Sequence, residues 1–467
     1  MSSRWKQAAF ISPLAVYTGN KLRQGASRTG KVSAKSAWTD LARQLAQWLS
    51  IVLEAGLTSK LALAATYAES AARENEPLSI GLGITAGDLS LREFFKFLPG
   101  AKEIVDRVIG DWSSAQRVLL SRLQRDRDRL PLIIQNGMSQ CVKHVTPGLS
   151  DPHNRGQTVT IVQFSNGSRV VYKPRPCEGE RIWFSALLWL NERGFGPAFY
   201  IPALISRRSY YWMSFVEHRG CKSINAVCRF YFRWGAQAAV AQLLGCTDLH
   251  RQNWIASGEH PVLVDCEMLG HALSNLDAEY SFSEHLHPLL KTGLLPLSCK
   301  DKAGYYRGIA PFDSDGIARE QRSCWPVYGG KLERPEKYRD SILEGFTAAW
   351  SFLCTPCRQK NFEKFAAQAS HRRHLRVLKR ASANYYRILK DSLQLEYMRE
   401  RGQRLQYLLE RCGRDETGTN EANSLLRCCI PRFTKNVSAH RGQKNLVISK
   451  RQMLNSAKIL AARLARN

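Results

Sequence analysis

The spacing of apolar and polar residues predicts helices in the first quarter of the chain. Apolar residues recur with a period near 3.6 in three segments, 37–55, 57–74 and 111–129. Residues 1–36 lack such a pattern and are rich in Ser, Arg, Lys and Gly, so we expect them to be partly disordered.

A short region of sheet follows. Residues 157–164 (Q-T-V-T-I-V-Q-F) and 169–173 (R-V-V-Y-K) are strand-like. Asn166-Gly167 between them favours the positive φ angles of a type I′ turn, which predicts a β-hairpin. A helix is predicted at 178–192, and Glu178 or Glu180 in it could pair with Lys173 at the end of the second strand.

The rest of the chain is predicted to be mainly helical. Residues 224–275 begin with a helix and lead to the apolar run 261–264, which is typical of a buried strand. Residues 276–330 carry Gly, Pro and Ser and resemble an inserted loop. Helical patterns return at 335–412 and again near 453–465.

These elements predict an α+β fold with a small sheet lobe, a helical lobe and helical accessory regions. The expected domains are a basic segment at 1–36, a helical accessory region at 37–135, a core at 136–435 and a basic tail at 436–467. We detect no internal repeat.

Composition is typical of a cytoplasmic enzyme. Of 467 residues 44% are hydrophobic, and no run of 18 apolar residues or secretory signal is present. The 13 cysteines are odd in number and form no framework, which indicates reduced thiols. Cys354 and Cys357 form a single C-x-x-C motif. Such an isolated motif more often binds no metal than forms half of a zinc site.

The net charge of +28, from 68 Lys and Arg against 40 Asp and Glu, has two interpretations. Nucleic-acid binding is one, but no recognition motif accompanies the charge, and the basic residues are spread along the chain. The other, which we favour, is attraction of acidic peptides, nucleotides and phosphopeptides.

The most informative polar pattern is T-D-L-H-R-Q-N at 247–253 followed by Asp265. Asp248 precedes Asn253 by five residues, and Asp265 follows Asn253 by twelve, at the end of the predicted strand. Phosphoryl-transfer enzymes of the kinase type need one Asp to accept the hydroxyl proton and an Asn and a second Asp to hold Mg²⁺. Lys173, on a strand upstream, has the place of a phosphate-binding lysine, which favours a kinase-like bilobal core.

The loop before the hairpin departs from that layout. Residues 148–156 (G-L-S-D-P-H-N-R-G) lack G-x-G-x-x-G and carry Asp151 and His153, which suggests extra chemistry at the phosphate. Taken singly, each of these residues is more often a turn residue, a helix cap or a solvated side chain. Their order and spacing together favour the kinase-like site.

Several longer motifs share the order of one known family. They are segments 91–100 (L-R-E-F-F-K-F-L-P-G), 121–126 (S-R-L-Q-R-D), 171–175 (V-Y-K-P-R), 212–221 (W-M-S-F-V-E-H-R-G-C), 230–235 (F-Y-F-R-W-G), 247–253 and 292–296 (T-G-L-L-P). Over about residues 90–435 the chain resembles the N-terminal dehydratase region of class II lanthipeptide synthetases, the LanM type. It departs from the family at Ser214, where Glu is usual, and at Cys429, where Asp precedes Ile-Pro.

The resemblance implies an ATP- and Mg²⁺-dependent enzyme that phosphorylates Ser and Thr of a ribosomal precursor peptide with a leader, and then eliminates the phosphate. The residues matching phosphorylation and metal–nucleotide positions are Asp248, His250, Asn253, Asp265 and Glu267, with Mg²⁺ on Asn253 and Asp265. Those matching elimination are Asp151, His153, Lys173, Arg376 and Ser382; Lys173 also matches nucleotide binding.

Arg376 and Ser382 lie in H-L-R-V-L-K-R-A-S, similar to the family's R-x-x-x-R-x-T, with Tyr385 following and Ser382 in place of Thr. From the residues alone, Arg376 could equally be a solvated residue of a basic helix face. A kinase without elimination, or a non-catalytic peptide-binding relative, therefore stays open. Because no cyclase zinc site is recognised, we expect a stand-alone or truncated dehydratase whose product another protein would cyclise.

Overall fold

The computed structural model describes residues 36–52, 95–96, 98–134, 141–269, 287–296, 310–312, 323–370, 373–377, 379–437 and 449–465. The predicted helix at 57–74, the expected disorder at 1–35 and most of the loop at 276–330 lie outside these residues. Contacts divide the chain into two compact units, each assembled from separate stretches. Unit 1 takes Met1–Arg175, Leu204–Ser214 and Arg380–Arg432, and unit 2 takes Pro176–Ala203, Phe215–Lys379 and Phe433–Asn467.

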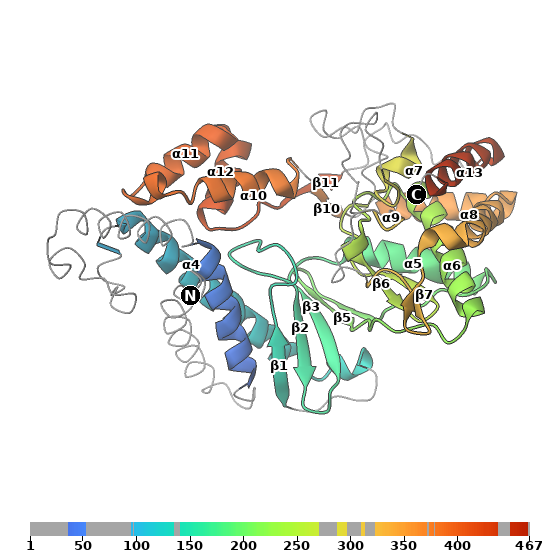
Figure 1. The fold of residues 1–467 in the computed structure, drawn as a ribbon, viewed down its shortest axis with the longest axis horizontal. Helices are drawn as coiled ribbons and strands as arrows, with labels where there is room; N and C mark the ends of the chain where they lie inside the picture. The colour runs from blue at the N-terminus through green and yellow to red at the C-terminus, as the bar shows by residue number, and fades with distance from the viewer. Residues whose placement is uncertain are drawn as a thin grey trace, which may run out of the picture. The chain divides into compact units, whose positions relative to one another are not determined.

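Unit 1 contains an antiparallel five-stranded sheet in the order β1-β2-β3-β5-β4 (Figure 1). Its strands are β1 (Val142–Thr146), β2 (Thr160–Phe164), β3 (Arg169–Lys173), β4 (Leu204–Ser206) and β5 (Tyr211–Ser214). The β-branched and aromatic residues of β2, β3 and β5 suit a pleated surface that is buried on at least one face.

The predicted hairpin is confirmed as β2–β3, but its turn differs. Only Gly167 has a left-handed φ, of 84°, whereas a type I′ turn needs a positive φ at Asn166 as well. The amide of Phe164 donates to Ser168 O at 2.8 Å and that of Gly167 to Phe164 O at 2.9 Å. The loop therefore holds three residues with a glycine bulge, so the type I′ assignment is wrong.

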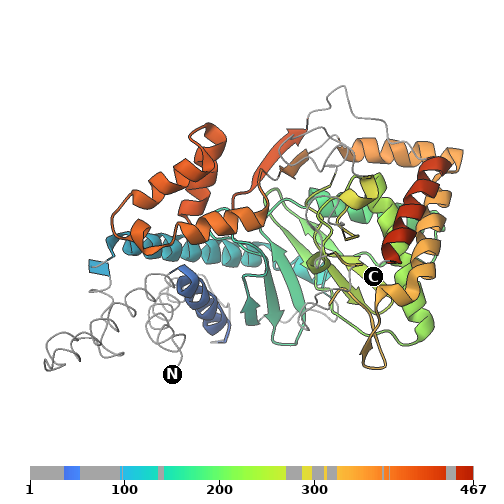
Figure 2. The same ribbon diagram turned by 45° about the horizontal axis from the view of Figure 1, so that its top comes forward.

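Helix α4 (Pro99–Asp126) covers this sheet together with a helix at 36–52 (Figure 2). It begins earlier than the predicted 111–129, because Pro99 is favoured at the first helical position, where no amide hydrogen bond is needed. Its apolar face packs with the sheet in one buried core.

The S-R-L-Q-R-D motif at the end of α4 proves to be a structural connection. Arg122 donates to Tyr172 Oη of β3 at 2.5 Å. The buried Asp126 carboxylate accepts hydrogen bonds from Arg207, from Tyr210 Oη at 2.7 Å and from Trp212 Nε1 at 2.9 Å. The motif thus ties the helix to strand β5 and the loop before it.

Unit 1 has a second small core, which includes Tyr385, Tyr407 and Leu408. The remaining helices of the unit are η1 (Leu130–Leu132), α10 (Ser382–Asp391), η7 (Leu395–Met398), α11 (Gln403–Cys412) and α12 (Glu416–Leu426), of which α10, α11 and α12 surround this core. The Asp415 side chain caps the start of α12 by accepting from Gly418 N at 3.0 Å.

Unit 2 is mainly helical and carries short two-stranded sheets. Its helices are α5 (Glu178–Glu192), α6 (Ile224–Leu243), η2 (Arg251–Asn253), α7 (Pro288–Lys291), η6 (Pro335–Tyr338), α8 (Arg339–Leu353), α9 (Pro356–Ser370) and α13 (Lys450–Leu464). Its strands are β6 (Trp254–Ser257), β7 (His260–Leu263), β8 (Val327–Tyr328), β9 (Lys331–Leu332), β10 (Arg373–Val377) and β11 (Phe433–Val437). The predicted helices at 178–192 and near 453–465 and the strand near 261–264 are confirmed as α5, α13 and β7.

The helix pair α6 and α8 packs backbone against backbone. A Cβ on Gly235 would lie 1.9 Å from Ile342 O, and one on Gly345 would lie 1.8 Å from Phe232 O. Each glycine therefore admits the partner helix at a distance that no other residue allows. The pair forms the centre of unit 2, where Tyr231 of α6 also stacks on Tyr338 at 4.8 Å between ring centroids.

One prediction of helix is wrong. Residues 373–377, inside the predicted helical stretch 335–412, form strand β10, which pairs antiparallel with β11. Among the described residues, no helix has the length and apolar character needed to cross a membrane.

Candidate active site

The residues Asp248, Asp265 and Glu267, which we call the acidic cluster, lie in unit 2 on two segments joined by hydrogen bonds. Thr247 N donates to Met268 O at 2.8 Å. Asp248 has a left-handed φ of 61°, which costs a non-glycine residue about 1–2 kcal/mol, although Asp tolerates it better than most. Such conformations persist where surrounding contacts enforce them, often at functional sites.

Asn253 provides one of the contacts that hold Asp248 in this conformation. Its Nδ2 donates to Asp248 O at 2.9 Å, and its backbone carbonyl accepts from Val264 N at 2.7 Å. The first hydrogen bond uses the amide nitrogen, so the side-chain oxygen stays an acceptor of the kind that Mg²⁺ prefers. The second holds the residue before Asp265 against Asn253. The structure thus brings together Asp248, Asn253 and Asp265.

The acidic cluster carries more negative than positive charge. Burial raises the pKa of Asp248, and Asp265 and Glu267 raise it further, whereas His250 and Arg376 oppose the shift. A carboxyl whose proton affinity is raised is a better proton acceptor than an exposed aspartate. His250 lies directly before η2, at the start of the turn that ends at Asn253.

Arg376 joins this cluster. Its Nη1 lies 3.1 Å from Glu267 Oε1, and the side chains are only 11% and 10% exposed. Since Arg376 lies on strand β10, the alternative of a solvated helix-face residue is wrong. A buried cation among carboxylates has the charge and donors to bind a phosphate.

The start of helix α5 contacts the same segment. A Cβ on Gly179 would lie 1.8 Å from Cys266 O, so this position admits only glycine without movement. The buried Glu180 carboxylate accepts from Cys266 N at 3.4 Å. Glu180, one of the two predicted partners of Lys173, thus contacts the residue after Asp265, and Gly179 and Glu180 together hold the backbone at Cys266, within the acidic cluster.

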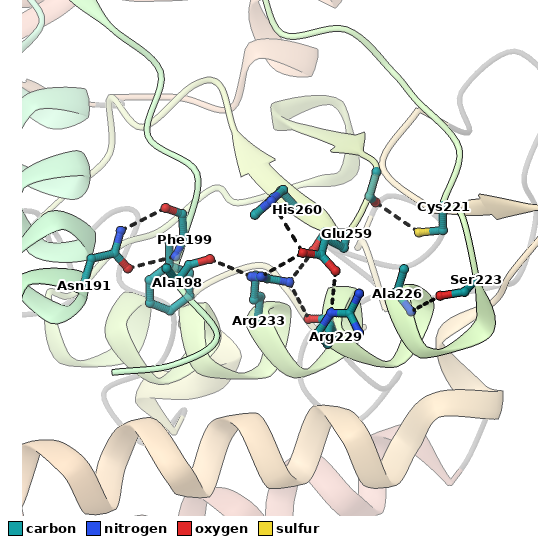
Figure 3. Close-up of polar contacts among 11 residues, drawn as sticks. Asn191, Ala198, Phe199, Cys221, Ser223, Ala226, Arg229, Arg233, Glu259 and His260 are labelled. Carbon is teal, nitrogen blue, oxygen red and sulfur yellow. Dashed lines mark hydrogen bonds and ion pairs between the residues drawn. The ribbon is translucent and has the colours of Figure 1, made fainter. Parts of the chain in front are cut away.

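The outer end of the β6–β7 hairpin is fixed by an ion-pair group (Figure 3). Arg233 of α6 lies 3.2 Å from Glu259 Oε1 and donates to Ala198 O at 2.8 Å, and Arg229 pairs with the other oxygen of Glu259. Burial, then the charge of Arg233, lowers the pKa of His260 to about 4, so this ring is neutral at pH 7. These contacts hold the hairpin that carries Asn253 and Asp265 at its inner end.

Asp151 and His153 lie in unit 1, in a tight loop before β2. His153 and Gln157 exchange backbone hydrogen bonds of 3.0 and 2.8 Å, and Asn154, Arg155 and Gly156 between them all have left-handed φ. His153 Nδ1 lies 2.7 Å from Ile430 O. Because a carbonyl only accepts, Nδ1 carries hydrogen, which leaves Nε2 as the basic nitrogen of the neutral ring.

Lys173 and Ser382 also belong to unit 1. Lys173 is buried, 3% exposed, with Nζ 5.6 Å from the centroid of the Tyr211 ring opposite it on β5, so it is not a solvated strand lysine. Ser382 is the first residue of α10 and is half-buried. Ser214, where the family has Glu, is buried on β5 opposite Val170.

The predicted residues thus form two groups, one in each unit. The structure brings Arg376, which was expected to act with Ser382, to the acidic cluster. Within the described residues no three His, Cys, Asp or Glu side chains form a metal cage. Asn253 and Asp265 still fit Mg²⁺, since that ion is typically bound by one or two carboxylates together with substrate phosphates and water.

Two residues near these groups have no recognised motif. One is Gly179. The sequence could have indicated it, because a glycine in the first turn of a predicted helix suggests close contact with another segment. The other is Tyr386 on α10, whose hydroxyl donates to Asp151 Oδ1 at 2.8 Å. No pattern in the sequence links residues so far apart.

The fold and these groups define a two-unit protein of mixed helix and antiparallel sheet, with a half-buried acidic cluster and a histidine–aspartate loop. Residues 99–436 match the family described as a domain of unknown function (DUF4135), and the chain belongs to that family. It is also similar to the lacticin 481/lactococcin biosynthesis protein LcnDR2 of Lactococcus lactis subsp. lactis, with 23% identity over 293 residues. That alignment covers 54% of this chain and 31% of the relative. Together they confirm the resemblance to LanM-type lanthipeptide synthetases.

Proposed function

We propose that this chain dehydrates Ser and Thr residues of a ribosomal precursor peptide by ATP-dependent phosphorylation followed by elimination of phosphate. The observation that carries the proposal is the acidic cluster with Asn253 and Arg376 beside it. The similarity to a protein named for lacticin 481/lactococcin biosynthesis supports a lanthipeptide precursor as the substrate. A kinase-like fold is part of the proposal, supported by the antiparallel sheet that carries Lys173 and the loop–strand arrangement from Asp248 to Asp265.

In the first step Asp248 accepts the proton of the peptide hydroxyl, because its raised pKa favours proton uptake. Asn253 and Asp265 hold Mg²⁺, Glu267 supports them, and Lys173 binds the nucleotide phosphates. When bound, Mg²⁺ neutralises charge on the phosphates during transfer. His250 lies close enough to oppose the rise in the pKa of Asp248.

In the second step a base removes the Cα proton of the phosphorylated residue. The Cα–H electron pair forms the Cα=Cβ bond, the Cβ–O bond breaks, and its electrons leave with the phosphate. His153 Nε2 and Asp151 supply the base, and Arg376, Lys173 and Ser382 supply donors to the departing phosphate. Phosphate leaves far more readily than hydroxide, which is why phosphorylation comes first.

Mass spectrometry of the precursor peptide after incubation with Mg-ATP tests the proposal. Dehydration lowers the mass by about 18 Da per residue, whereas retained phosphate raises it by about 80 Da. Asp265→Asn should abolish both changes, and Asp340→Asn, an exposed aspartate of α8, should alter neither. Retained phosphate with the wild-type chain would establish a kinase without elimination. Failure to bind Mg-ATP would indicate a non-catalytic relative.

A further inference from the structure

The loop that carries Asp151 is held at a second point, by a tyrosine from a distant segment. Tyr386 Oη donates to Asp151 Oδ1 at 2.8 Å, and both residues belong to unit 1. Tyr386 is 46% exposed, although its hydroxyl is engaged with the carboxylate. Burial of the hydroxyl, then the charge of Asp151 and their hydrogen bond, raises the pKa of Tyr386, so it stays a donor at neutral pH.

The position of Tyr386 connects it with another predicted residue. Tyr386 follows Ser382 by four residues on α10, so the two side chains lie on one face of that helix. The neighbouring Tyr385 points elsewhere, since its hydroxyl donates to Glu421 at 2.6 Å within the buried core of α10–α12. Consecutive tyrosines therefore have different roles: Tyr385 fixes the helix, and Tyr386 contacts the loop.

The backbone of the loop is held by contacts with residues 429–430. Ile430 N donates to Pro152 O at 2.8 Å, His153 binds Ile430 O, and Gly156 N donates to Cys429 Sγ at 3.2 Å. These contacts fix the backbone on both sides of Asp151 but leave its carboxylate free to rotate. The hydrogen bond from Tyr386 to Oδ1 removes that freedom, and it leaves Oδ2 as the oxygen able to accept a further proton or donor.

We propose that Tyr386 is a positioning residue for the elimination step, which acts by fixing the Asp151 carboxylate in the loop that also carries His153. The inference rests on the proposed function. It assigns no proton or bond change to Tyr386: the Cα proton still passes to the His153–Asp151 base, and the Cβ–O electrons still leave with phosphate. Its effect is on the orientation of Asp151, and phosphorylation by the acidic cluster of unit 2 does not depend on it.

The test compares Tyr386→Phe with wild type on two substrates, the precursor peptide and the same peptide made with phosphoserine at a modified position. Hydrogen bonds to charged groups typically change an equilibrium by about 10- to 100-fold. We expect kcat for elimination from the phosphopeptide to fall by about tenfold or more, with KM and the phosphorylation rate unchanged. Tyr328→Phe, which removes the hydroxyl of an exposed tyrosine on β8, should change none of these rates.

A double-mutant cycle separates positioning from a general structural role. If Tyr386 acts through Asp151, adding Tyr386→Phe to Asp151→Asn should cause no further loss of elimination. Full additivity would overturn the inference, and so would equal elimination rates in wild type and Tyr386→Phe. A wild-type chain that leaves phosphoserine intact would instead overturn the proposed function, and the inference with it. Unchanged thermal unfolding of Tyr386→Phe verifies that the variant folds.

Discussion

Asp126 in unit 1, which is buried, and Asp248 in unit 2, which is half-buried, occupy opposite electrostatic environments. Burial alone would raise the pKa of Asp126, but hydrogen bonds from Arg207, Tyr210 and Trp212 hold it below its ordinary value. Each carboxylate oxygen of Asp126 accepts from its own donors. Its negative charge is therefore fully compensated within the protein.

Asp248 lies near two other carboxylates as well as His250 and Arg376. Asp265 and Glu267 add to the effect of burial, and its pKa is raised. The folded chain thus keeps three carboxylates close together, and Arg376, which pairs with Glu267 at 3.1 Å, offsets only part of their negative charge. A buried carboxylate whose oxygens both accept hydrogen bonds holds the fold, whereas carboxylates that lie close together raise one another's pKa, an arrangement common at functional sites.

The largest expected effect comes from Asp248→Asn. Loss of the proton acceptor should slow phosphorylation by about 100-fold or more. Because the ionised form is disfavoured in the folded state, removing the charge should not lower the free energy of unfolding measured without Mg²⁺, and we expect it to rise. Peptide mass and urea unfolding measure the two effects. A large loss of stability would mean that Asp248 is structural.

Asp126→Asn should give the reverse pattern. Asp126 is buried but Arg207 is 28% exposed, so the loss comes mainly from the hydrogen bonds to the carboxylate, each typically worth about 1.5–3 kcal/mol; urea unfolding should shift strongly while activity per folded molecule is retained. The exposed Asp128, two residues further on, is the matched control. Because the pKa of Asp126 is lowered from 3.8, its contribution is complete above that pH and is lost on further acidification. The variant should therefore lose less stability than wild type below about pH 4.

Arg376→Ala should separate the two chemical steps. Without the guanidinium, elimination should slow by roughly 10- to 100-fold, and phosphopeptide should accumulate while ATP is still consumed. The control is Arg219→Ala, because Arg219 pairs with Glu217 at the same 3.1 Å but with side chains 60% and 43% exposed. Unmodified peptide from Arg376→Ala would assign this residue to the first step instead.

The smallest effect is expected from an exposed pair. Lys102 and Asp106 form an i,i+4 ion pair on α4 with side chains 51% and 61% exposed. Lys102→Ala should change the free energy of unfolding by less than about 0.5 kcal/mol, since water screens such pairs. A loss as large as that of Asp126→Asn would show that burial does not explain the difference between the two kinds of pair.

The sequence predicted those helices and strands that depend on neighbouring residues. It did not predict the strand and the hydrogen bonds that depend on residues far apart in the chain. The β2–β3 hairpin and α5 follow from residues adjacent in sequence, so β3 and α5 were predicted with their observed ends, whereas β2 begins three residues later than predicted. The strand that holds Arg376 pairs with β11, which lies far along the chain, and its basic sequence alone resembles a helix face. The hydrogen bonds of Asp126 and Tyr386 likewise join residues with no shared motif, so no sequence pattern could predict them.

The reciprocal glycine contact of α6 and α8 has a consequence for the order of folding. The chain between these helices contains Asp248, Asn253, Asp265 and Glu267, so packing Gly235 against Gly345 closes one long loop around all four. Closing a loop of about 100 residues costs only slightly more entropy than closing one of 50, roughly 0.6 kcal/mol. Once the loop is closed, the acidic residues have fewer conformations available before they reach their folded positions. A methyl group at either glycine would therefore delay assembly of the whole segment.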